Sequence, residues 1–556
     1  MTPNAFAELN NFQNILTIQP LDILTDPIQR DIINELKSVE ENLELNIKKN
    51  ELLNKTEKEN LLNNLHIMLI SVLNLWYSIN NTGPWCIVGP KGWEYVDNQD
   101  DIFVKLFYKI YNENPNNFFD LYTTRHQKFK NIIKLINYII LKITNKKKYI
   151  WINGKTNAFK KLIDKVQAKD KEAIFVFLLN ADEKSLLRSV SSLLNLLNPF
   201  KKKKMIGFTP VYNKNFSLKA DVTTIIKNIN CKSVNLVQKI FIKSIYSKLN
   251  YIGSLENYTD NLFKKTKSKL LITDGIRWSE SLLISSVANK NNVKKILISH
   301  GSVGLPKDET SKYLIKKQAQ GLLFSNFSDE TVVQSKSAEK CLNFYNPNMK
   351  RKMFRPIMWS INESLKTTKT NGDFTILHAS TPKVAFGGRI WTYESPSEYI
   401  ENLKSLILNL KNEKNIKLII KARPTNECDK ETILKTLPKS DNCIIKFGGD
   451  FSEDLRNADL LVSYSSTTIE QALYSKIPVI IYHHSDRYSH IIPEKTEDGL
   501  RNAVYVLNKK NFIREFYKII KLHKNKPLTE NELKEYIWQS KMNSYSEFVN
   551  KLVEKI

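Results

Sequence analysis

Two stretches of the chain alternate short apolar runs with longer segments whose apolar residues recur every three or four positions. Uninterrupted apolar runs are typical of strands buried on both faces of a parallel sheet, and the longer segments of the helices that cover such a sheet. The pattern predicts an α/β fold with two doubly wound domains that face a cleft. The expected strands are Tyr149–Asn153, Ala173–Leu179, Met205–Val211, Leu270–Thr273, Lys295–Ser299 and Gly321–Phe324, then Phe374–Leu377, Lys417–Lys421, Cys443–Phe447, Leu460–Val462, Val479–Tyr482 and Ala503–Leu507.

The same pattern divides the chain into four parts. Residues 1–145 are expected to be mostly helical, with a loop or short hairpin over Asn81–Gly92. Residues 146–355 and 371–510 hold the two α/β domains, and residues 511–556 are expected to be helical and to pack back across both. The most apolar segment, His66–Ile79, is shorter than the roughly 20 residues that a membrane-spanning helix needs, so it predicts a buried helix.

The net charge of the chain indicates which class of partner it binds. The 556 residues carry a formal net charge of +27, which favours an anionic partner such as a nucleotide, a phospholipid surface or a charged glycan. The lysines are scattered and no nucleic-acid motif surrounds them, so nucleic acid is not an expected partner; a general compositional bias is the alternative explanation. The segment Lys128–Lys148, apolar on one side with lysines throughout, would suit an anionic membrane surface or an ordinary docked helix.

The five cysteines indicate the compartment. Their number is odd and no CxxC pair occurs, which argues against a disulfide framework or a zinc site and for a reducing environment. The first residues are polar and lack the apolar core of a signal peptide. A cytoplasmic protein, at most peripheral at the inner face of the plasma membrane, is therefore expected.

In the first α/β domain, two candidate catalytic residues follow strand ends. In the run LLITDG, Asp274 directly follows the expected strand, and in the run ILISHG, His300 does the same. Ligands bind at the carboxyl ends of strands in an open parallel sheet, and Asp and His are the usual general bases. A helix N-cap is the alternative for Asp274, and a hydrogen-bonded core imidazole the alternative for His300.

In the second α/β domain, hydroxyl groups crowd the turn between the run Leu460–Val462 and a short helical pattern. Side-chain hydroxyls and free backbone N–H groups at such a turn make an anion site, so it is a candidate seat for nucleotide phosphates; simple helix capping is the alternative. Glu470 could accept hydrogen bonds from ribose hydroxyls, or complement the helix dipole. The hydroxyl residues of the turn are Ser465, Ser466, Thr467 and Thr468.

Further polar residues follow two other strands of this domain. The run TILHASTPKVAFGGR brings Ser380 and Arg389 into one loop, and LIIKARP brings Lys421 and Arg423 to a strand exit. Guanidinium groups can pair bidentately with phosphate, although a charged solvent-facing turn is the alternative for Lys421 and Arg423. The segment Tyr482–His490 holds three histidines and an aspartate, but adjacent histidines diverge on an extended chain, so no metal site is expected there.

The second domain resembles the donor-binding domain of GT-B glycosyltransferases, enzymes with two Rossmann-like domains. The elements that carry the likeness are the AST run, KARP, and NADLLVSYSSTTIEQALYSKIPVIIY. It looks most like the inverting enzymes of bacterial surface-polysaccharide and teichoic-acid assembly, including CDP-glycerol glycerophosphotransferase-like and sialyl- or Kdo-transferase-like proteins. Ser465–Thr468 match the family's Ser-Ser or Ser-Thr pair. Arg423 stands where the family usually has His.

The resemblance implies an activity. It implies an inverting, metal-independent transfer from a CMP-, CDP- or UDP-linked donor to a carbohydrate or lipid-linked acceptor, with no cofactor and with Asp274 or His300 as the base. The His300–Gly301 pair resembles the glycerophosphotransferase-like group, and Asp274–Gly275 the sialyltransferase-like group. The alternatives are an alditol-phosphate transferase on the same fold, a non-hydrolysing nucleotide-sugar epimerase, and a non-catalytic scaffold.

Overall fold

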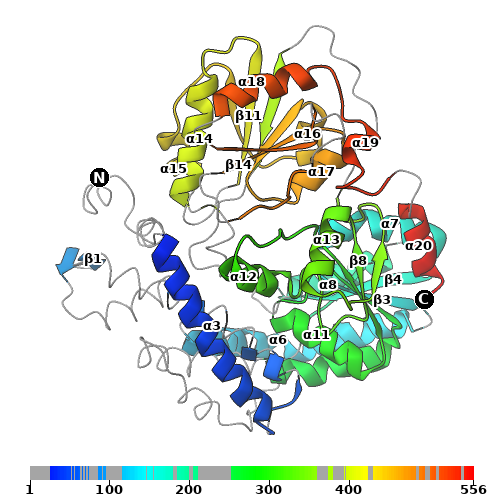
Figure 1. Ribbon diagram of the computed structural model, residues 1–556. Coiled ribbons are helices and arrows are strands. Elements are labelled where there is room, and N and C mark those ends of the chain that lie inside the picture. Colours follow the sequence, from blue (N-terminus) through cyan, green and yellow to red (C-terminus); the bar gives the residue numbers. More distant parts are fainter. Residues whose placement is uncertain are drawn as a thin grey trace.

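The computed structural model shows two α/β lobes stacked on each other, with an N-terminal helix, α3 (Asp26–Lys49), lying along the lower one (Figure 1). The lower lobe, which precedes the upper one in sequence, is called the N-lobe below, and the upper one the C-lobe. The structure describes residues 26–51, 53–55, 57–59, 61–62, 66, 69–70, 73, 86–89, 92–95, 115–145, 147–154, 156–179, 185–198, 205–210, 252–277, 279–359, 373–379, 394, 396–423, 430–483, 488–494, 501–508, 512–539 and 544–556.

The N-lobe is built on a seven-stranded parallel sheet with the order β5-β4-β3-β6-β7-β8-β9. Its strands are almost wholly apolar at their centres, because both faces of the sheet are covered by helices. One face is covered by α6, α8, α11 and the helix over residues 252–266, and the other by α7 and α20. The strands are β3 (Lys148–Asn153), β4 (Ala173–Leu178), β5 (Met205–Phe208), β6 (Leu270–Thr273), β7 (Lys294–Ile298), β8 (Glu330–Val333) and β9 (Arg351–Met353).

The C-lobe is built on a six-stranded parallel sheet with the order β12-β11-β10-β13-β14-β15. Helices α14, α15 and α18 cover one face, and α16, α17 and α19 the other. Two parallel sheets, each wound on both sides, confirm the predicted α/β class. The strands are β10 (Phe374–His378), β11 (Ile416–Ala422), β12 (Cys443–Phe447), β13 (Leu460–Ser463), β14 (Val479–His483) and β15 (Val504–Asn508).

The helices that cover the sheets follow the predicted alternation. Because they connect parallel strands, they run antiparallel to the strands and bury one apolar face each. Their bounds are α6 (Pro115–Ile143), α7 (Lys160–Lys169), α8 (Ser185–Leu197), α11 (Ser279–Lys290), α12 (Glu309–Ala319), α13 (Lys336–Tyr345), α14 (Pro396–Leu410), α15 (Lys430–Thr436), α16 (Phe451–Arg456), α17 (Thr468–Tyr474), α18 (Phe512–His523), α19 (Glu530–Leu533) and α20 (Tyr545–Val553), with a 3₁₀ turn over Thr156–Phe159.

In the N-lobe, one predicted strand is wrong and two observed strands were not predicted. Gly321–Phe324 forms a turn, and the chain enters the sheet later, at β8. β8 begins with Glu330, a buried carboxylate that pairs with Lys294, Lys352 and Lys555. A strand that opens with a charged residue gives no apolar run, so the sequence pattern favours the more apolar Gly321–Phe324 instead. β9 lies near the end of residues 146–355, where no apolar run indicates a strand, and its residues are only half buried.

The N-terminal region contributes a hairpin and a docked helix among the residues described. β1 (Cys86–Gly89) pairs antiparallel with β2 (Gly92–Tyr95), so of the loop or short hairpin predicted over Asn81–Gly92 the structure has the hairpin, extended to Tyr95. α3 lies against α12 of the N-lobe, and Arg30 forms an ion pair with Asp308, the N-cap of α12. Where the structure describes the chain, no helix is both long and apolar enough to cross a membrane.

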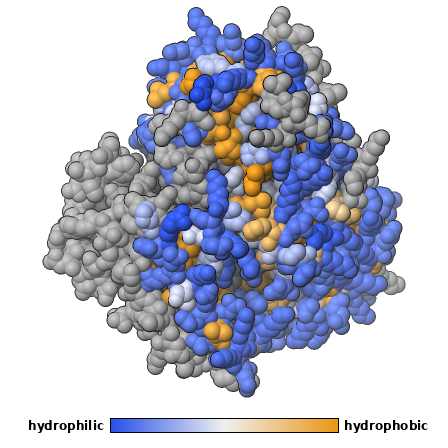
Figure 2. Space-filling view, in the orientation of Figure 1, coloured by the Kyte–Doolittle hydropathy of each residue, from blue (hydrophilic) through white to orange (hydrophobic). Residues whose placement is uncertain are grey.

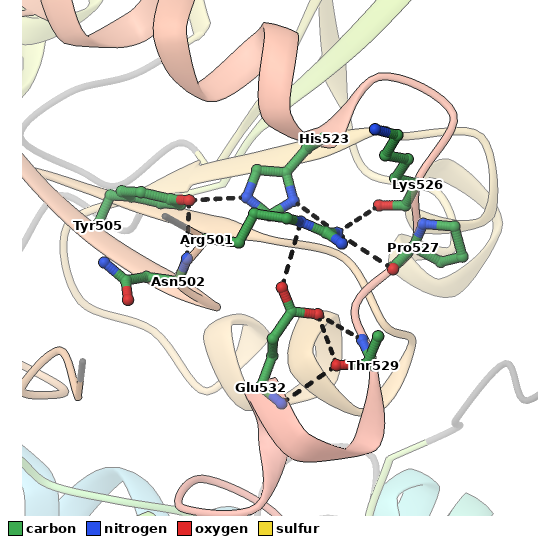
Figure 3. A network of polar contacts seen from close by, with 8 residues as sticks. All are labelled: Arg501, Asn502, Tyr505, His523, Lys526, Pro527, Thr529 and Glu532. Carbon is green, nitrogen blue, oxygen red and sulfur yellow. Dashed lines mark hydrogen bonds and ion pairs between the residues drawn. The ribbon is translucent and has the colours of Figure 1, made fainter. Parts of the chain in front are cut away.

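The chain leaves the C-lobe sheet through a network of polar contacts that fixes its return path (Figure 3). The guanidinium of Arg501 donates to the carbonyls of Lys526 and Pro527 and pairs with Glu532, and it also contacts Nδ1 of His523. Burial and the nearby Arg501 charge lower the pKa of His523 to about 4, so the imidazole is neutral and can accept from the arginine. The network holds α18 and α19 together before the chain crosses to α20.

The final helix belongs to the opposite lobe. Phe548, Val549 and Leu552 of α20 are buried in the N-lobe core, beside α7. In Figure 1, α20 accordingly lies in the lower lobe, although α18 and α19 lie in the upper one. Figure 2 shows the same face as largely hydrophilic, with hydrophobic residues gathered in a band through the middle of the molecule.

Candidate functional site

The carboxyl ends of the two sheets meet, and the predicted catalytic residues lie at that junction. Asp274 directly follows β6, and His300 follows β7 by two residues. Since β6 and β7 are neighbours in the sheet, the two side chains come together, with His300 Nε2 3.8 Å from Asp274 Oδ2. The Asp274 side chain is 9% exposed and that of His300 42%. A buried carboxylate behind an accessible imidazole is an arrangement suited to general-base chemistry.

The carboxylate of Asp274 is seated against the backbone at the end of β3. Asp274 N donates to the carbonyl of Asn153 over 3.3 Å. The next residue, Gly154, has φ +136°, and a Cβ built on it would overlap the Asp274 carboxylate. Only glycine permits both that backbone conformation and this close approach. Gly154 is thus a site residue that the sequence analysis missed, although a glycine directly after a buried strand was visible.

The loop that carries His300 touches the hydroxyl turn of the other lobe. Gly301 has φ +140°, and a Cβ on it would overlap Glu470 and come within 3.3 Å of the Thr467 methyl group. The Ser302 N–H donates to both carboxylate oxygens of Glu470, over 3.0 and 3.1 Å. The Ser335 hydroxyl donates to the same carboxylate. The two lobes are therefore in direct contact at this point.

Glu470 is fully buried in this contact. Burial raises the pKa of its carboxyl to about 7, against the lowering effect of the hydrogen bonds from Ser335 and Ser302. The sequence predicted that Glu470 accepts hydrogen bonds from ribose hydroxyls or complements the helix dipole. In this structure its oxygens instead accept from protein N–H and O–H groups of the N-lobe.

A buried histidine adds a second link between the lobes. His490 Nε2 lies 3.1 Å from the Ser302 hydroxyl, and its Nδ1 lies 2.9 Å from the Tyr488 hydroxyl and 3.3 Å from that of Ser465. The Tyr488 hydroxyl donates its one proton to the carbonyl of Val303, so it accepts from the imidazole. Nδ1 therefore donates to Tyr488, and Nε2 lies within hydrogen-bond distance of the Ser302 hydroxyl.

The other hydroxyls of the turn are half-buried beside this link. Ser466 Oγ accepts from the N–H of Thr468 over 3.3 Å, which closes the turn onto α17. The Thr468 hydroxyl is buried and has no hydrogen-bond partner among the residues that the structure describes. Buried hydroxyls are normally bonded, so the Thr468 hydroxyl is an unsatisfied polar group of this turn. The turn therefore offers Ser466 and Thr468 next to the loop of His300.

The predicted cations lie farther along the sheet. Lys421 lies at the end of β11 and Arg423 directly follows that strand, which is two strands from β13 and hence about 10 Å away across the sheet. Lys421 forms an ion pair with Asp454, which also accepts from Lys446 over 2.7 Å. Although burial opposes it, these two lysines lower the pKa of Asp454. Arg423 is exposed.

Several predicted residues lie outside the part of the chain that the structure describes. They are Ser380, Arg389, His484 and Asp486. Of the set weighed as a metal site, His490 is instead engaged with Ser302, Ser465 and Tyr488. Ser302 and Ser335 could not be predicted from the sequence, because a serine in a loop gives no functional signal until the position of the opposite lobe is known.

Comparisons with known proteins return structures only. No family model and no curated protein matches the chain. Among solved structures, UDP-GlcNAc 2-epimerase from Neisseria meningitidis bound to UDP-GlcNAc is 13% identical, covering 74% of this chain and 99% of its own, with a TM-score of 0.40. UGT71G1 from Medicago truncatula, complexed with UDP-glucose, is 10% identical over 74% and 98%, with a TM-score of 0.39.

A third solved structure is similar to the chain to the same degree. Alr3699/HepE from Anabaena, in complex with UDP and glucose, is 9% identical over 74% of this chain and 98% of its own, with a TM-score of 0.39. Likenesses of this degree do not bear on activity. The function is accordingly argued below from this chain's own residues.

Proposed function

We propose that this protein is a glycosyltransferase that moves a sugar from a nucleotide-activated donor to a carbohydrate or lipid-linked acceptor. The observation that carries the proposal is the meeting of two chemically different groups across the lobes. The N-lobe supplies the paired Asp274 and His300, and the C-lobe supplies the hydroxyl turn, with Thr467 packed against the Gly301 position. A base and an anion-binding turn are the two parts that such a transfer requires.

In the proposed reaction, the imidazole of His300 takes the proton from the acceptor hydroxyl. Asp274 Oδ2 lies 3.8 Å from Nε2, so Nδ1 is the ring nitrogen proposed to take the proton, and the nearby carboxylate stabilises the imidazolium that forms. The acceptor oxygen then bonds to the anomeric carbon as the bond from that carbon to the donor's phosphate oxygen breaks. The hydroxyls of Ser466 and Thr468 meet the negative charge of the departing phosphate.

Nucleotide binding is the first test. A ligand that binds only the folded state stabilises it by about 2.7 kcal/mol at 100 times its Kd. We expect one of CMP, CDP, UDP and GDP to raise the melting temperature of the wild type, and Ser466→Ala to abolish that rise. Ser440→Ala is the matched control, because Ser440 lies in the same lobe at the amino end of β12 and bonds only locally. No shift with any of the four nucleotides would overturn the proposal.

Product analysis separates the proposed transfer from the rival activities. A glycosyltransferase releases the free nucleotide only when an acceptor is present, whereas an epimerase changes its nucleotide sugar without one. An alditol-phosphate transferase would release CMP from a CDP-linked alditol and leave phosphate in the product. The donor that gives the largest thermal shift is therefore incubated with and without acceptor, and the products are identified by mass spectrometry.

A further inference from the structure

We propose that helices α6 and α8 of the N-lobe form a docking surface for an anionic lipid bilayer. α8 carries an exposed apolar stripe, whose residues are 37% to 71% exposed and recur at spacings of three and four. Such residues share one face of a helix, while the other face packs into the N-lobe core through Leu186, Leu193 and Leu196. The stripe consists of Leu187, Val190, Leu194 and Leu197.

The neighbouring helix continues the exposed apolar surface. α6 packs against α8 and buries Ile136 and Ile140 in the same core. Beside that buried face, five of its large apolar side chains are 43% to 58% exposed. Single exposed apolar residues are ordinary, but nine on two adjoining helices mark an interaction surface. Those of α6 are Phe129, Ile132, Leu135, Tyr138 and Ile143.

The charges on these helices indicate what binds to the surface. Neither α8 nor the stretch of α6 from residue 129 to 143 contains an aspartate or glutamate, whereas Lys134 and Lys142 are exposed beside the apolar residues. In the sequence, α8 is followed shortly by the run Lys201–Lys204. Leucines interspersed with lysines are the composition of helices that bind in the interface of anionic membranes. A second copy of the same face would instead oppose lysine to lysine.

The topology sets the orientation of this surface. α6 leads into β3 and α8 leads into β5, so both helices end at the amino edge of the parallel sheet. Asp274 and His300 lie at its carboxyl edge. A bilayer against α6 and α8 would thus contact the side of the lobe and leave the junction of the lobes open to ligands. The inference does not depend on the proposed activity.

Co-sedimentation with vesicles tests the surface. We expect the full chain to pellet with vesicles of phosphatidylcholine and phosphatidylglycerol, far less with phosphatidylcholine alone, and less again when the salt rises from about 0.1 M to about 1 M, since the Debye length falls from about 10 to about 3 Å. The double variant Leu187→Ser/Leu194→Ser should weaken binding at least tenfold. Lys134→Glu/Lys142→Glu should weaken it most at low salt.

A matched control and two contrary outcomes complete the test. Leu408→Ser removes a leucine that is 51% exposed on α14 of the other lobe, and it should bind vesicles as the wild type does. The inference is overturned if the wild type stays in the supernatant with anionic vesicles, or if Leu408→Ser loses as much binding as the α8 variant. Self-association by light scattering, abolished in the α8 variant, would assign the surface to a second copy instead. The thermal unfolding transition of each variant, recorded without ligand, is an independent check of folding.

Discussion

At the residue scale, the sequence left open whether Asp274 or His300 is the base, and the structure places them in one pair. We expect His300→Ala to lower kcat by about 10² to 10⁴, the usual contribution of a general base, and Asp274→Asn to lower it through loss of the charge behind the imidazole. Both variants should keep the nucleotide-induced rise in melting temperature, because neither touches the hydroxyl turn. Steady-state kinetics and thermal shift on the same samples measure this.

The control for that pair is an aspartate remote from the junction. Asp441→Asn changes an exposed residue just before β12, and its kcat should equal that of the wild type. If His300→Ala kept full activity while Asp274→Asn lost it, the imidazole would not be the base and the carboxylate alone would serve.

Glu470 makes stability depend on pH. Its carboxyl has a pKa of about 7 in the folded protein and 4.5 as a model compound, so the folded state holds the proton over that interval and the unfolded state does not. The contribution of the protonated carboxyl to the free energy of unfolding is fully present below pH 4.5. It is lost as the pH rises to about 7, and the free energy of unfolding then falls by about 3 kcal/mol. Glu470→Gln keeps an acceptor for Ser302 and cannot titrate.

The expected result is a pH-dependent difference in melting temperature between the wild type and Glu470→Gln. Between pH 5 and pH 8 the melting temperature of the wild type should fall relative to that of Glu470→Gln. Glu453→Gln, which alters an exposed carboxylate on α16, should follow the wild type. Parallel curves for the wild type and Glu470→Gln would show that this carboxyl is not held protonated.

At the element scale, one buried carboxylate links the N-terminal helix to the N-lobe, in addition to the Arg30–Asp308 ion pair. Glu40 of α3 bonds to His66 and to the Tyr313 hydroxyl, and pairs with Lys317 of α12 over 2.9 Å. Although burial opposes it, these neighbours lower the pKa of Glu40 to about 2. The ionised carboxylate therefore contributes stability above pH 4.5, and that contribution is lost as the pH falls toward 2.

Removing this carboxylate should release α3. Glu40→Ala leaves the buried partners without their acceptor, and breaking a buried charged pair costs about 3 to 5 kcal/mol. We expect α3 and α12 to lose protection in hydrogen exchange, with the C-lobe sheet unchanged. Glu44→Ala, which removes an exposed pair with Lys48 on the same helix, should cost under about 1 kcal/mol. Equal exchange in both variants would mean that Glu40 does not anchor the helix.

Elements with uninterrupted apolar runs could be predicted from the sequence, and those with buried charge could not. β10, β11, β12, β13 and β14 lie where their apolar runs predicted, within one residue at each end. β8 was missed because Glu330 opens it, and its lysine partners come from β7, β9 and the C-terminus. The strand-exit rule likewise led to Asp274 and His300. It could not give Ser302 or His490, whose roles depend on how the two lobes meet.

At the scale of the whole molecule, the two lobes are joined by buried polar contacts and by the returning chain. Besides the bonds of Glu470, the Tyr474 hydroxyl donates to the carbonyl of Gln334 over 2.8 Å, and the indole of Trp538 donates to that of Val333 over 3.4 Å. If one of these bonds were broken while its groups stayed buried, each unsatisfied group would destabilise the protein by about 1 to 3 kcal/mol. Partial separation is therefore costly, and we expect both lobes to unfold in a single calorimetric transition.

A substitution in the last helix tests that coupling. Phe548 of α20 is buried in the N-lobe core, with its ring 5.0 Å from that of Phe354, and Phe548→Ala should cost about 3 to 5 kcal/mol. If the lobes unfold together, the whole transition moves to lower temperature, including the part reported by hydrogen exchange in the C-lobe sheet. Phe344→Ala, which removes a ring that is 48% exposed on α13, should leave the transition in place. Two resolved transitions, of which Phe548→Ala moves only one, would mean that the lobes fold independently, since the polar contacts between them would then be too weak to transmit the loss.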